Sequence, residues 1–143
     1  MGLRRTIAFG FLLAAAPVAA MAACPAATSP DYYAVPKEYA RAKQVALVRV
    51  ESETWLEGAD RNSLSGVLYD VRVLKDYKGG APARLKMRSD TEAGRLRMAI
   101  GEAYLVFLNQ EDGGGLGLDS CGNSAPASQA GPALSQVKAL SRR

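Results

Sequence analysis

The segment that decides the fold is VLYDVRV, which spans residues 67–73. Every second residue from Val67 to Val73 is apolar, while Asp70 and Arg72 occupy positions between them. Successive side chains of a β-strand point to opposite faces, so such a strand has one apolar and one largely polar face. The segment therefore predicts a half-buried strand that covers a core.

Further strands are expected on both sides of this segment. Residues 45–53 are rich in valine, and residues 83–88 alternate apolar side chains with Arg84, Lys86 and Arg88. Residues 104–108 form a continuous apolar run, which is typical of a strand covered on both faces. A glycine-rich turn at residues 112–115 should connect this strand to a hairpin partner at 116–120. We expect Val71, Val73, Leu105 and Phe107 in the core, and the three basic side chains on the solvent face.

About five strands at this spacing predict an all-β domain with a small barrel or sandwich architecture. Residues 56–65 are predicted to be a polar loop, because glycine, aspartate and asparagine gather there. Residues 36–42 suit a short helix with Pro36 in its first turn, where the missing N–H costs nothing. Near the end, Leu134, Val137 and Leu140 recur at helical spacing, which predicts a short terminal helix or a frayed end.

The first 22 residues have the pattern of a secretory signal peptide. Arg4 and Arg5 precede an apolar run, and Ala20-Met21-Ala22 places small residues where signal peptidase cuts. The apolar run is shorter than the ~20 residues that a membrane span needs. We therefore expect an exported chain that begins at Ala23 and resides in the periplasm or the medium. Two alternatives stay open: twin-arginine export, and a lipobox that would make Cys24 a lipid-anchored first residue.

Removing 22 residues from 143 leaves 121, which is the size of one domain. The whole chain has 18 basic and 14 acidic residues, for a net charge of +4, and two of the basic residues are Arg4 and Arg5. The remaining charge of +2 is poor evidence for a nucleic-acid partner, and none is expected.

The chain offers few side chains for chemistry. It has no histidine, so it lacks the commonest general base and the commonest zinc ligand. It contains no Gly-x-Ser-x-Gly elbow, and the glycines at 113–115 lack the Gly-Lys-Ser/Thr ending of a phosphate loop. No carboxylate pair stands out as an acid/base couple. These observations predict a protein that is not an enzyme and has no cofactor or metal site.

The two cysteines, Cys24 and Cys121, lie near opposite ends of the exported chain. In an oxidising compartment, a disulfide between them is the simplest expectation, although a reactive thiol is the alternative. The basic row Arg84, Lys86 and Arg88 could hold a polyanion such as lipopolysaccharide or an acidic glycan. Because no aromatic residues interleave these charges, a solvated strand face is the favoured interpretation.

Three segments resemble the netrin-like domain, which occurs in bacterial secreted proteins and in tissue inhibitors of metalloproteinases. They are YDVRVLKDYKG at residues 69–79, GEAYLVF at residues 101–107 and Asp119-Ser120-Cys121. The resemblance covers residues 24–126 and implies a five-stranded OB-like barrel, closed or partly open. We accordingly place the domain at residues 23–128 and a tail or short helix at residues 129–143.

The resemblance also bears on the cysteines. The inhibitors begin Cys-x-Cys, and their first cysteine pairs with a Cys-Gly in the middle of the domain. If Cys121 is the closing cysteine of the family, then Cys24 takes the third-residue position and Ala22 the first, and residues 91–96 lack the Cys-Gly. The resemblance thus implies that Cys24 and Cys121 keep one bridge and that the bridge bracing a chelating N-terminus is absent.

From these features we expect an exported, non-enzymatic module that binds an extracytoplasmic protein or other macromolecule. One alternative is a metalloprotease inhibitor that acts through a mature N-terminus at Ala23 and Cys24. An untethered N-terminus must lose conformational freedom on binding, at ~1–2 kcal/mol per residue, so this alternative is disfavoured. The other alternative is binding of a polyanion.

Overall fold

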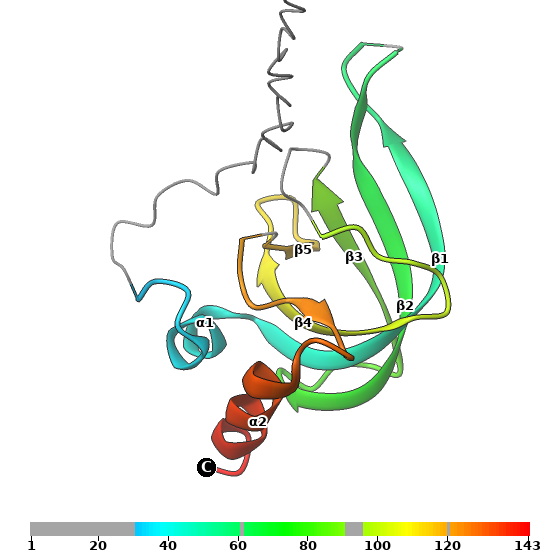
Figure 1. Ribbon diagram of the computed structural model, residues 1–143. Coiled ribbons are helices and arrows are strands. Elements are labelled where there is room, and N and C mark those ends of the chain that lie inside the picture. Colours follow the sequence, from blue (N-terminus) through cyan, green and yellow to red (C-terminus); the bar gives the residue numbers. More distant parts are fainter. Residues whose placement is uncertain (1–30, 61, 91–95, 120) are drawn as a thin grey trace, which may run out of the picture.

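The computed structural model describes residues 31–60, 62–90, 96–119 and 121–143. In these residues the chain forms six strands and two short helices (Figure 1). They are α1 (Val35–Arg41), β1 (Gln44–Glu57), β2 (Leu64–Lys78), β3 (Arg84–Asp90), β4 (Ala103–Gln110), β5 (Leu116–Leu118), β6 (Ala125–Pro126) and α2 (Gly131–Leu140).

Five of the strands close into a barrel. They follow the order β1-β2-β3-β5-β4, and β4 pairs back onto β1 to complete the ring. Strand β3 pairs with β5 in parallel, the other four contacts of the ring are antiparallel, and β6 adds to β4 outside it. The predicted all-β barrel with short helices is therefore confirmed.

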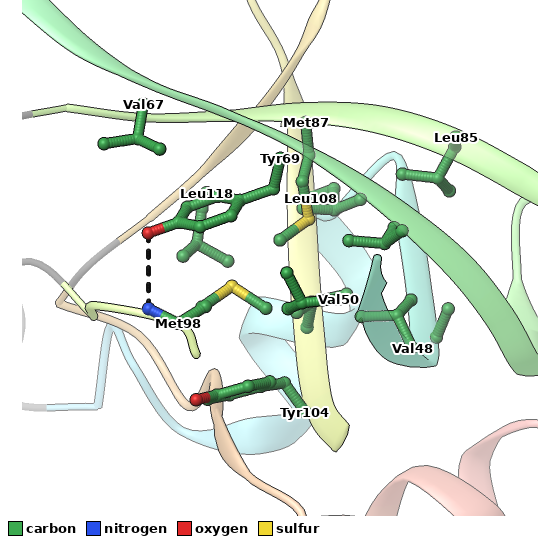
Figure 2. Packing of buried hydrophobic residues seen from close by; sticks show 13 residues of the cluster. Val48, Val50, Val67, Tyr69, Leu85, Met87, Met98, Tyr104, Leu108 and Leu118 are labelled. Atoms are coloured by element: carbon green, nitrogen blue, oxygen red, sulfur yellow. Dashed lines mark hydrogen bonds between the residues drawn. The ribbon is translucent and has the colours of Figure 1, made fainter. Parts of the chain in front are cut away.

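The barrel interior forms the first core. It is lined by Ala46, Val48, Val50, Val67, Tyr69, Val71, Leu85, Met87, Met98, Tyr104, Val106, Leu108 and Leu118. Figure 2 shows Tyr69 reaching across this interior, where its hydroxyl accepts a hydrogen bond of 3.3 Å from the backbone N–H of Met98. Met98, from the segment after residue 95, is thereby held in the barrel interior, where it is 1% exposed.

A second core lies outside the barrel, between the helices and the strands β1 and β4. Its buried members are Val35, Ala42, Val45, Leu105, Phe107, Ala130 and Val137. Successive residues of β4 alternate between the two cores, since Val106 points inward while Leu105 and Phe107 meet the helices. This explains the continuous apolar run and confirms that both faces of the strand are covered.

Three of the four expected core residues, Val71, Leu105 and Phe107, are buried. Val73 is only partly buried and packs against the edge of the barrel core, so this expectation was wrong. The reason is that β3 pairs with β2 only as far as Arg72, which leaves Val73 at the rim of the barrel.

The polar loop predicted at residues 56–65 is much shorter in the structure. Strand β1 continues to Glu57 and β2 begins at Leu64, so the turn has only residues 58–63. The two strand ends project beyond the barrel as a two-stranded hairpin (Figure 1). A hairpin outside the barrel needs no alternation of apolar residues, so its polar sequence concealed the strands.

The two helices pack beside each other on the second core (Figure 1). The predicted helix at residues 36–42 is α1, which begins one residue earlier and ends with its C-terminal carbonyls in contact with a lysine. The Lys78 ammonium donates hydrogen bonds to the carbonyl oxygens of Tyr39, Ala40 and Ala42 at 2.6, 2.9 and 2.7 Å. The expected terminal helix is α2. Neither of these helices, the two in the described part of the chain, is long and apolar enough to cross a membrane.

Candidate functional site

The predicted basic row lies on the outer face of β3, and the structure gives each member an acidic partner. Arg84 Nε lies 2.9 Å from Glu51 Oε2, and Lys86 Nζ lies 3.0 Å from Asp70 Oδ1. Arg88 Nε lies 3.5 Å from Asp90 Oδ1, and this side chain also donates to the Ser65 carbonyl at 3.3 Å. Arg84 and Lys86 are exposed as expected, but Arg88 is half-buried because it lies against the carbonyl of β2.

These ion pairs form a ladder of alternating charge across three strands. Glu51 of β1 also meets Arg72 of β2, at 2.7 Å. Hydrogen bonds from Arg84 and Arg72 lower the pKa of the Glu51 carboxyl, and a hydrogen bond from Lys86 does the same for the pKa of Asp70. A polyanion would have to displace these carboxylates, so the ladder favours a solvated strand face over a binding site.

The possible inhibitory N-terminus, Ala23 and Cys24, lies outside the described residues. The disulfide between Cys24 and Cys121 therefore stays a prediction. Cys121 itself is half-buried in the turn that follows β5, where its backbone N–H donates to Asp119 Oδ1 at 2.9 Å. The Asp119 side chain thus helps to fix the conformation of this turn.

A buried carboxylate ties this turn to α1, and our sequence reasoning missed it. Glu38 is only 3% exposed, and its Oε2 accepts hydrogen bonds from the backbone and side-chain nitrogens of Asn123, at 2.8 and 2.5 Å. The Asn123 amide also donates to the Tyr33 carbonyl at 2.6 Å. Burial raises the pKa of Glu38, although the Asn123 hydrogen bonds oppose this shift. A Cβ added to Gly122 would lie 1.8 Å from Glu38 Oε1, so a larger residue there would force the carboxylate or the turn to move.

We assign this cluster a structural role. It joins the segment before α1, α1 itself and the turn after β5, and it leaves the carboxylate without access to solvent. A signal was present in the sequence, because Glu38 follows Val35 at the spacing of the buried face of a helix. An acidic residue at such a position indicates a buried hydrogen-bond partner elsewhere in the chain.

Two exposed apolar side chains come from β1 and from the segment that precedes β4. Trp55 is 37% exposed and Ile100 is 60% exposed. The Arg97 guanidinium carbon lies 5.6 Å from the centre of the Trp55 ring, which is within the range of a cation–π contact. Arg97 and Ile100 also line a hollow of about 380 Å³, together with Glu53, Met98 and Ala99. We call Trp55, Arg97 and Ile100 the hairpin patch.

The backbone under the hairpin patch is held from both sides. The N–H of Ala99 donates to the Tyr104 hydroxyl at 2.9 Å, next to the Met98–Tyr69 hydrogen bond. The N–H of Gly101 then donates to the Val50 carbonyl at 2.8 Å, and Gly101 has a φ of +88°, which favours glycine. Arg97 and Ile100 are therefore presented on a braced segment.

Next to the hairpin patch, the pairing of β1 changes. Strand β4 pairs with β1 only from Gln44 to Arg49, and beyond that point β2 is the sole strand on β1 in the described part of the chain. Register irregularities occur between Val50 and Ser52 and between Leu56 and Glu57. Residues 52–56 lie between these two irregularities and keep a regular register with β2.

The described residues contain no group of three or more cysteine, aspartate or glutamate side chains that could hold a metal ion. No protein-family model matches the chain, and no curated protein matches it either.

Proposed function

We propose that this chain is an exported, non-enzymatic binding module of the netrin-like type, and that it binds an extracytoplasmic protein at the hairpin patch. The observation that carries the proposal is the exposure of Trp55 and Ile100. Signal-like residues 1–22, the absence of histidine and the family resemblance support the exported, non-enzymatic part.

The side chains of the hairpin patch would supply most of the affinity. Tryptophan and arginine are the residue types most enriched among those that dominate binding energy. The bracing of residues 98–101 means that little conformational freedom is lost when a partner binds. The patch would therefore bind a segment with an apolar side chain that packs beside Trp55.

The charges near the patch indicate what this segment carries. Glu53 lines the hollow and Glu57 lies exposed at the end of β1, and neither has an ion pair with another described residue. Opposite charges across an interface steer association and select partners. We therefore propose that the partner segment is basic.

A crosslinking experiment tests this proposal. The chain from residue 23 onward, with a photoreactive amino acid in place of Ile100, is incubated with an extracytoplasmic extract and irradiated. We expect one dominant adduct that mass spectrometry maps to a basic segment, and the synthetic segment should compete with its formation. Trp55→Ala should remove the adduct.

Leu74→Ala is the matched control, because Leu74 is 41% exposed and therefore resembles Trp55 in exposure, but it lies on β2. This variant should form the adduct as the unchanged chain does. Equal loss in both variants, or an adduct that maps to an acidic surface, would refute the proposal.

A further inference from the structure

A groove at the opposite side of the molecule carries an excess of positive charge. It lies between the end of β2 and the end of α2, has a volume of about 570 Å³, and is lined by Lys75, Asp76, Tyr77, Lys138, Ser141 and Arg142. We propose that this groove binds a ligand with two or more phosphate groups, such as a bisphosphorylated sugar. The proposal does not depend on the partner of the hairpin patch.

The cations of the groove differ from those of the predicted basic row. Lys75, Lys138 and Arg142 have no ion pair with any described residue, whereas Arg84 and Lys86 each contact a carboxylate. One acidic residue, Asp76, lines the groove, and its Oδ2 accepts a hydrogen bond of 3.1 Å from the Gly80 N–H. An anion entering the groove would therefore gain contacts without displacing a bound carboxylate.

A helix macrodipole alone does not account for these cations. Basic side chains near a helix C-terminus are favourable, which explains Lys138 and Arg142 at the end of α2. Lys75 is different, because it comes from β2 and adds a third like charge to the same groove. Like charges brought together repel one another, and an anionic ligand would relieve that repulsion.

The walls of the groove are held in place by the second core. Val137, next to Lys138, is fully buried, and Tyr77 and Leu140 pack against the same cluster. The Tyr77 carbonyl also accepts a hydrogen bond from the Tyr39 hydroxyl at 2.8 Å. The cations thus project from two fixed elements, and only their flexible side chains must be ordered on binding.

The position of the charges favours a ligand with more than one anionic group. Lys75 lies on one wall, and Lys138 and Arg142 lie on the other, so a single phosphate would contact one wall more closely than the other. An arginine can bind a phosphate through two parallel hydrogen bonds, and lysines act as point charges. A groove of this volume has room for a sugar ring between two phosphates.

Calorimetric titration of the chain from residue 23 onward tests the site at 0.15 M salt, where charges more than about 8 Å apart are screened. The soluble probe is glucose 1,6-bisphosphate, compared with glucose and with inorganic phosphate. We expect the bisphosphate to bind at least tenfold more tightly than inorganic phosphate, and glucose to give no signal. Vesicles of phosphatidylcholine with and without lipid A, which carries a bisphosphorylated disaccharide, show whether the ligand can be a lipid headgroup.

Lys138→Glu and Lys86→Glu form a matched pair, because each changes the net charge equally and each replaces an exposed lysine. Lys138→Glu should weaken binding of the bisphosphate at least tenfold, and Lys86→Glu by less than twofold. Lys75→Gln provides a milder second variant, which should also weaken binding, and circular dichroism checks that each variant is folded. Equal effects of the two glutamate variants, or no binding of the bisphosphate at 5 mM, would overturn the proposal.

Discussion

The two halves of β1 show how one strand can serve both stability and recognition. Residues 44–50 lie between β2 and β4, and five of these seven residues are buried. Residues 51–57 pair with β2 but not with β4, and none of them is buried. The change comes where β4 ends its pairing at Arg49, so sheet closure, rather than residue type alone, decides which half is exposed.

The largest expected effect comes from the core that packs against the inner half of β1. Phe107 lies opposite Val45 and is 1% exposed in the second core. Phe107→Ala should lower the free energy of unfolding by ~3–5 kcal/mol, because it removes a fully packed ring and leaves a cavity. Chemical denaturation measures this change. A loss below about 1 kcal/mol would mean that the inner half of β1 is not the packed half.

A smaller effect is expected at the Glu38–Asn123 cluster, which ties α1 to the turn after β5. Helix α1 immediately precedes the inner half of β1. Gly122→Ala would place a Cβ against the buried Glu38 carboxylate, so either the turn or the helix must shift. We expect a loss of about 1–3 kcal/mol, the usual cost of overpacking. Gly113→Ala is the control, since a Cβ there meets nothing within 4 Å. Thermal melts that place both variants at the same stability would contradict the structural role of the Glu38–Asn123 cluster.

The Glu38–Asn123 cluster also predicts that stability depends on pH. Burial raises the pKa of Glu38 above its ordinary value of 4.5, so the folded state binds this proton more tightly than the unfolded state does. The free energy of unfolding should therefore fall as the pH rises from 4.5 through the folded-state pKa. Glu38→Gln cannot titrate and should remove this slope, which denaturation at several pH values would detect.

Glu51→Gln is the control for this measurement. Hydrogen bonds from Arg84 and Arg72 lower the pKa of Glu51, so its contribution to stability is present above pH 4.5 and is lost as the pH falls below that value. This variant should keep the slope above pH 4.5. If Glu38→Gln retains the same slope as the unchanged chain, then the buried carboxylate is not its source.

The smallest effect on stability is expected in the outer half. Trp55→Ala removes a partly exposed ring and its contact with Arg97, which should lower the free energy of unfolding by about 1 kcal/mol or less. Comparison with Phe107→Ala in the same denaturant series checks the contrast between the halves. A loss of 3 kcal/mol at Trp55 would show that the outer half is also needed for folding.

The contrast between the halves also explains what could be predicted from the sequence. Strand β4 was recognisable because burial on both faces imposes a continuous apolar run on residues 104–108. The outer parts of β1 and β2 were not recognisable, since residues 54–57 and 64–66 show no regular alternation of apolar and polar side chains when no face has to be buried. Alternation reveals a strand only where one of its faces meets a core.

The candidate site was harder to predict than the fold. The exposure of Trp55 depends on where β4 stops pairing with β1, and Arg97 reaches the Trp55 ring from a segment that is distant in the sequence. The basic row was predicted in the right place, but its acidic partners lie up to 33 residues away in the chain. Their pairing follows from strand register, which a single sequence specifies poorly where both faces are polar.

The pairing between β1 and β4, which closes the barrel, has a consequence for the order of folding. It pairs Gln44 with Leu108, so all of β2 and β3 must lie within the loop that it closes. The β1–β2 hairpin joins residues that are much closer in the chain, and such local pairing costs less entropy and forms earlier. We therefore expect the hairpin that carries Trp55 to form before the barrel closes around it.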